Sequence, residues 1–169
     1  MGRGYRFFGG TAAVLGAASL VCALLTLLPG LLLPESGWLT GVSVGSAFLF
    51  LFAAALWGFS SVSDRRMLWT AFRCLPGKAQ TELGMLVAGG VALTAATMLQ
   101  GLGRPSSPKV EGGRHYAHET APRGWVEILS RAEYEALVEL EQRLSHGISS
   151  LVLGIAAALF LSMGELRKR

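Results

Sequence analysis

Charge is scarce in this chain, and no acidic, basic or histidine residue falls well inside any of its long apolar runs. Only 15% of the 169 residues are charged, whereas 51% are hydrophobic. An ordinary soluble domain carries roughly a quarter charged residues, so this composition indicates an integral membrane protein. Because proton and ion pathways normally need intramembrane ionisable groups, the same scarcity disfavours a transporter or channel.

Cysteines are few, and catalytic signatures are missing. Cys22 lies in an apolar run and Cys74 in a polar one, so we expect them at different depths and infer no disulfide. No Ser-His-Asp, phosphate-loop or dinucleotide signature occurs. We therefore expect no cofactor and favour a non-enzymatic role. The net charge of +4 follows from the basic rim described below and implies no nucleic-acid partner.

Four apolar segments are present, at 7–33, 42–62, 85–102 and 148–163. Most reach the roughly 20 residues that a helix needs to cross a bilayer. The pattern predicts an all-α membrane protein of four transmembrane helices. A small extracytoplasmic β-hairpin and a helix are expected between the third and fourth of them.

The distribution of lysine and arginine predicts the orientation. Basic residues cluster near both termini and in the 63–84 loop, whereas the first outer loop has none. We expect a multi-pass protein of the cell membrane with both termini cytoplasmic. It divides into residues 1–103 with a cytoplasmic interfacial loop at 63–84, an extracytoplasmic domain at 104–146, and a last span with a basic tail at 147–169.

The 63–84 loop contains a predicted amphipathic helix, with Asp64 as its cap and Pro76-Gly77 as its stop. Such a helix suits the headgroup region of the bilayer, where arginines reach phosphates and tryptophan anchors. The predicted membrane-interface residues are Arg65, Arg66, Trp69, Phe72 and Arg73.

Small residues recur at spacings that let helices approach closely. Gly41 and Gly45 form a GxxxG pair, Gly89 and Gly90 are adjacent, and Gly154 and Ala158 are one turn apart. We take Gly41, Gly45, Gly154 and Ala158 as helix-packing residues. They serve either the four-helix bundle or contact between two copies of the chain.

The polar segment 104–146 has three parts. Residues 103–113 are rich in turn formers and are expected to be extended and mobile. Two strands, 114–119 and 125–129, flank a turn, with Trp125, Glu127 and Leu129 on one face and Val126 and Ile128 on the other. Ser130 and Glu133 match a capping box that starts a helix. This helix either continues into the last span or bends at Gly147.

All three histidines, His115, His118 and His146, fall in the expected external part, with His146 at the membrane edge. His115 and His118 are the metal candidates. Residues three apart on a strand point to opposite faces, and nothing resembles a closed ligand set. We therefore expect no metal site.

The chain resembles tetraspanins in having a small first and a large second outer loop, but it lacks their Cys-Cys-Gly motif. It is similar to small bacterial four-helix membrane proteins whose external segment carries a Tyr, an apolar-Ser/Thr-x-x-Glu-Tyr element and an arginine before the last helix. The matching residues are Tyr116, Leu129-Ser130, Glu133-Tyr134 and Arg143. Some such proteins look like accessory or self-protection proteins, and the resemblance implies a role of that kind.

The first hypothesis is an accessory component that binds another membrane protein, or a second copy of itself, through its outer segment. Aromatic and arginine side chains are the usual energetic centres of interfaces. An immunity or stress-protection protein that binds an external toxin or peptide is the first alternative. A membrane enzyme acting on lipid or quinone through His115, His118 or Glu127 is the second. The predicted partner-binding residues are Tyr116, Trp125, Tyr134, Glu135, Glu139 and Arg143, of which the aromatic ones serve equally well for packing inside the domain.

Overall fold

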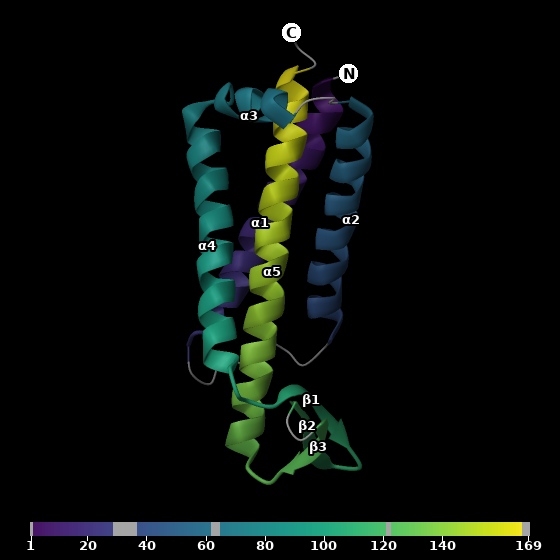
Figure 1. Cartoon of the computed structure of the whole chain (residues 1–169), viewed down its shortest axis with the longest axis vertical. Helices are drawn as coiled ribbons and strands as arrows, with labels where there is room; N and C mark the ends of the chain where they lie inside the picture. The colour runs from purple at the N-terminus through teal and green to yellow at the C-terminus, as the bar shows by residue number, and fades with distance from the viewer. Residues whose placement is uncertain (1, 29–36, 62–64, 121–122, 167–169) are drawn as a thin grey trace.

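The structure is a computed structural model that describes residues 2–28, 37–61, 65–120 and 123–166 (Figure 1). Four of its helices are long and apolar enough to cross a membrane, namely α1 (Gly2–Leu25), α2 (Gly37–Ser61), α4 (Gly77–Gly101) and α5 (Arg131–Leu166). A short helix, α3 (Arg65–Arg73), lies across one end of the bundle. The predicted four spans therefore exist as helices. A small sheet of three strands packs beside α5 at the opposite end.

Helix α5 is the centre of the bundle, with α1, α2 and α4 around it (Figure 1). Of its most apolar window, 61% is buried, compared with 28% or less in the other three long helices. Its buried face carries Leu153, Ala156, Ala157 and Phe160. Phe160 packs among the rings of Phe8, Phe50 and Trp57. The apolar core is thus built on the last helix of the chain.

Helix α5 is one continuous rod of 36 residues, with no bend that divides it at Gly147. At 1.5 Å per residue it is about 54 Å long, whereas the hydrocarbon core of a bilayer is about 30 Å thick. It begins directly after Ser130, as the capping box predicts, and the Tyr134 amide donates to the Ser130 carbonyl at 3.1 Å. The rod is long enough to cross a membrane and carry the sheet on its free end.

Glycines set how closely the neighbouring helices approach α5. A Cβ built on Gly16 of α1 would lie 3.2 Å from Cβ of Leu153. A Cβ built on Gly154 would lie 3.0 Å from Cγ2 of Val87 on α4. Gly154 therefore lies at a close helix contact. By contrast, Gly41 and Gly45 are exposed, and a Cβ on either would meet no described atom within 4 Å. Among the described residues, packing inside the bundle does not use this GxxxG pair, because α2 turns it away from α5.

The helix boundaries differ from the apolar boundaries. Helix α4 starts at Gly77 with Pro76 as its N-cap, not at residue 85, so much of the 63–84 loop is helical. The Gln80 side chain donates to the carbonyls of Arg73 (2.9 Å) and Leu75 (2.7 Å). These bonds satisfy two backbone carbonyl oxygens that lack intrahelical donors at the end of α3 and just beyond it. The proposed cap Asp64 and the side chains of Arg65 and Arg66 lie outside the described residues.

The sheet contains β1 (Ser106–Glu111), β2 (Arg114–Thr120) and β3 (Arg123–Ile128), antiparallel and in that order. A hairpin was predicted here, but its second strand begins at Arg123, inside the predicted turn, and ends before Leu129. Strand β1 was not predicted, because residues 103–113 were expected to be extended and mobile and were not assigned to a strand. Gly112 and Gly113 have φ of 60° and 79°, as a two-residue hairpin turn requires. Pro108 fits because β1 is an edge strand with a register shift between Ser106 and Lys109.

Candidate functional site

One face of the sheet is packed onto α5. Ala117 and Ile128 form a buried cluster with Tyr134 and Leu137, and Val138 packs against it. The His115 ring lies against the Tyr134 ring, with 4.2 Å between centroids. Full burial of one large apolar side chain contributes about 1.5 to 3 kcal/mol. This cluster therefore fixes the sheet to the rod.

The opposite face, here called the open face, carries a compact group of aromatic and charged side chains. Lys109 Nζ lies 4.0 Å from the centroid of the Trp125 ring, a cation–π distance. The His118 ring meets Trp125 edge-on at 5.5 Å. Trp125 nevertheless remains 50% exposed. The residues of the open face are Lys109, Glu111, Arg114, Tyr116, His118, Trp125 and Glu127.

Charges on the open face are paired across and along the strands. Arg114 and Glu127 approach to 3.5 Å, and Lys109 and Glu111 to 2.7 Å. The ammonium of Lys109 donates a hydrogen bond to Glu111 and, by this bond and its charge, holds the pKa of that carboxyl below its usual value. Exposed pairs such as these add little stability.

The six predicted partner-binding residues do not form one surface. Tyr116 and Trp125 lie on the open face. Glu135 accepts a hydrogen bond from Arg131 at 2.7 Å on α5, and Glu139 is half-buried on the same helix. Tyr134 is buried under the sheet. Binding by these residues stays a prediction, but Tyr134 is engaged inside the chain, which is the packing role that the sequence left open.

Arg143 joins three helices at the sheet end of the bundle. Its guanidinium donates to the carbonyl and the hydroxyl of Thr26, just beyond α1, and to the side-chain oxygen of Gln100 on α4. Thr26 is fully buried. Terminal carbonyls of a helix lack intrahelical donors and favour a cation. Arg143 therefore acts as a structural tie, which its position in a polar stretch of sequence does not reveal.

His146 lies inside the bundle and not on an external surface. Its side chain is 1% exposed, and its Nδ1 is 3.3 Å from the Ser43 hydroxyl, which in turn is 3.0 Å from the Ser19 hydroxyl. This chain of contacts connects α5, α2 and α1. This burial arises because α5 enters the bundle before its sequence becomes continuously apolar. The position of His146 at the membrane edge stays a prediction.

The remaining two histidines lie on opposite faces of the sheet. His115 is on the packed face with Tyr134, whereas His118 is on the open face with Trp125. The three residues of the enzyme hypothesis are therefore not brought together, since Glu127 shares a face only with His118. Among the described residues, no group of three or more His, Cys, Asp or Glu is placed to hold a metal ion.

The other end of the bundle carries the predicted membrane-interface residues. On α3, the Trp69 and Phe72 rings are stacked with centroids 5.8 Å apart, and Trp69 is 63% exposed. Both border a shallow cavity of about 360 Å³ whose other walls include Val87 and Ala158. Arg73 is exposed at the end of α3. This arrangement fits an amphipathic helix with an exposed aromatic anchor.

Comparison of the chain with protein-family models, with curated proteins and with solved structures gives no match.

Proposed function

We propose that this protein is a non-enzymatic membrane protein that associates with another membrane protein through the open face of its sheet. In this proposal the four long helices span the cell membrane, the sheet is extracytoplasmic and both chain termini are cytoplasmic. The positions of basic residues support that orientation. Arg6, Arg73 and Lys78 belong to the end of the bundle opposite the sheet, and basic residues favour the cytoplasmic side.

The observation that carries the proposal is the half-exposed Trp125 in a group of side chains that contact one another. Lys109 and His118 hold the indole ring from two sides. Tryptophan and tyrosine are enriched among residues that dominate binding energy. Side chains that are ordered before binding lose less entropy when a partner docks. An exposed aromatic whose ring already contacts its neighbours is therefore suited to recognition.

The continuity of α5 supports an accessory role over that of a detached binding module. The packed face fixes the sheet to residues 134–138, and the same helix then forms the bundle core. No flexible linker separates the recognition face from the helices, since α5 runs unbroken from Arg131 to Leu166. A partner bound to the open face would thus be held at a set distance and angle from the membrane.

The test is quantitative mass spectrometry of proteins that co-purify with the tagged full-length chain in mild detergent. A double variant, Tyr116→Ala with Trp125→Ala, removes the aromatic centre of the open face without touching the packed face. Trp69→Ala is the matched control, because Trp69 is also an exposed indole but lies on α3 at the other end.

We expect one stoichiometric partner with the wild type and with Trp69→Ala, and at least a tenfold loss of it with the double variant, because hot-spot truncations cost 2 kcal/mol or more, or roughly 30-fold. Recovery of the chain alone, or an equal amount of partner with the double variant, would refute the proposal. Point variants are preferable to deletion of the loop, because a deletion would remove the first part of α5.

A further inference from the structure

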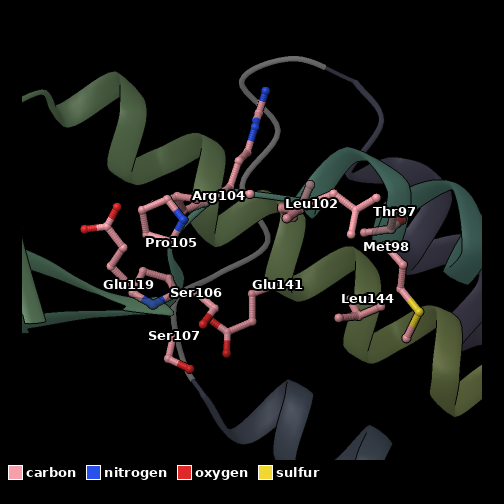
Figure 2. A pocket seen from close by; sticks show the side chains of 15 residues that line it. Thr97, Met98, Leu102, Arg104, Pro105, Ser106, Ser107, Glu119, Glu141 and Leu144 are labelled. Carbon is pink, nitrogen blue, oxygen red and sulfur yellow. The ribbon is translucent and has the colours of Figure 1, made fainter. Parts of the chain in front are cut away.

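A cavity of about 750 Å³ lies where the end of α4 and the following turn meet the sheet and α5 (Figure 2). Its volume falls in the range of roughly 300 to 1,000 Å³ typical of small-molecule sites. The open face and the Arg143 tie do not take part in it, so the cavity is separate from the surface proposed above for partner binding. The proposed binding of a partner to the open face does not involve this cavity.

The two ends of the cavity differ in polarity. Met98 of α4 and Leu144 of α5 lie at one end, while Ser106, Ser107 and Glu119 lie at the other, and the Glu141 carboxylate extends toward the two serines (Figure 2). The apolar end adjoins the bundle and the polar end adjoins the sheet. Met98 and Leu102 are 53% and 73% exposed, which leaves the apolar end open sideways. The cavity is therefore amphipathic along the long axis of the bundle.

The polar end has an uncompensated negative charge. Glu119 and Glu141 line it, and within the described part of the chain neither side chain has an ion pair or a hydrogen bond. Arg104 also borders the cavity, but Figure 2 shows its guanidinium directed away from both carboxylates. Two carboxylates without a cation favour a positively charged ligand group and repel a negatively charged one.

We propose that this cavity binds a phospholipid with a primary-ammonium headgroup, of the phosphatidylethanolamine class, from the leaflet at the sheet end. The ammonium meets the Glu141 carboxylate beside the two serines, Glu119 adds negative charge at the same end, and the upper acyl chains lie against Met98, Leu102 and Leu144 and leave through the open side. A lipid in that leaflet has its head toward water and its tails toward the bundle, which matches the polarity of the cavity. An ammonium donates three hydrogen bonds, whereas a quaternary choline head donates none.

The test is native mass spectrometry of the purified full-length chain, titrated with phosphatidylethanolamine, phosphatidylcholine or phosphatidylglycerol that carry identical acyl chains. The variant is Glu119→Gln with Glu141→Gln, which keeps the shape of both side chains. The control is Glu133→Gln, because Glu133 is exposed on the first turn of α5 and does not line the cavity. Glycerophosphoethanolamine, which has the head without the acyl chains, is a competitor.

We expect the wild type and Glu133→Gln to bind the ethanolamine lipid roughly tenfold more tightly than either other lipid, since charge-assisted hydrogen bonds are the strong ones. The double Gln variant should lose this preference while eluting as the same monodisperse species. Equal binding of all three lipids would show ordinary annular contact and overturn the proposal, as would an unchanged preference in the double variant. Full displacement by glycerophosphoethanolamine would show that the free headgroup, and not the lipid, is the ligand.

The proposal rests on insertion of the four helices in a membrane but not on the proposed protein partner. The two tests can therefore fail separately, because the open-face variants leave Glu119 and Glu141 intact and the Gln variants leave the open face intact.

Discussion

Replacing Gly90 by alanine tests a close contact between α4 and α5. A Cβ added to Gly90 would lie 2.9 Å from the backbone nitrogen of Leu151 and 3.1 Å from its Cα. Ordinary carbon contacts have their optimum at about 3.5 to 4.0 Å. Because the obstructing atoms belong to the backbone of a central helix, no side-chain rotation relieves the clash. The two helices must separate by about half an ångström or more.

The magnitude follows from two opposing effects. Adding a methyl group to a packed core typically destabilises by about 1 to 3 kcal/mol. Alanine is also the better helix former, by roughly 0.8 to 1 kcal/mol in water. Gly84→Ala on the same helix is the matched control, because a Cβ there meets nothing within 4 Å. Subtracting the two variants removes the helix-propensity effect and leaves a difference of about 1 to 3 kcal/mol, with Gly90→Ala the less stable.

The assay is equilibrium unfolding of the purified chain in mixed micelles by increasing the fraction of denaturing detergent, followed by circular dichroism. Gly84→Ala should unfold at or above the wild-type midpoint and Gly90→Ala below it. Equal midpoints for the two variants would show that α4 and α5 do not approach at Gly90 and would refute the packing described here.

Further variants test the tie, the packed face and the unused GxxxG pair. Arg143→Met leaves the buried Thr26 carbonyl without its charged donor and should lower the free energy of unfolding by about 2 to 3 kcal/mol in the same assay. Arg131→Met, which loses an exposed pair, should lower it by under ~1 kcal/mol. Similar losses for both variants would contradict a structural tie. Tyr134→Ala removes a buried ring under the sheet and should make residues 104–130 sensitive to limited proteolysis while the four long helices persist. Unchanged sensitivity would show that the packed face does not hold the sheet. Gly45→Leu should leave the stability of the single chain unchanged, since a Cβ there meets no described atom. A shift from dimer to monomer in analytical ultracentrifugation would assign Gly45 to contact between copies. A loss of monomer stability would refute the exposed placement of Gly45.

The four long helices and the hairpin were predictable because each depends on a local pattern. Apolar runs of sufficient length predict helices, and alternation on both sides of a predicted turn at residues 120–124 predicts a hairpin. Their faces also follow, since Trp125 and Glu127 share one face of the sheet and Val126 and Ile128 the other. Strand β1 was missed although Gly112-Gly113 is a hairpin signal, because the prolines at 105 and 108 suggested an irregular segment. An edge position tolerates such prolines.

The sequence left packing and partner binding open for Tyr134, and the roles of Arg143 and His146 could not be predicted in the same way. Each lies in a stretch whose composition is typical of an exposed helix, and their partners are distant in sequence. Arg143 contacts Thr26 and Gln100, and His146 contacts Ser43. Hydropathy measures how polar a segment is, but not which of its faces meets another helix.

By itself, the sequence determined the number of long helices, the start of the last one after Ser130 and the alternation of the hairpin, because these depend on hydropathy, capping and spacing within a few residues. Only the tertiary structure decided that α5 is the central helix, that Gly90 and Gly154 are close contacts while Gly41 and Gly45 are not, and that Glu119 and Glu141 border one cavity. Those outcomes depend on which surfaces of separate elements meet. That choice is made by packing across the whole chain, where no local pattern records it.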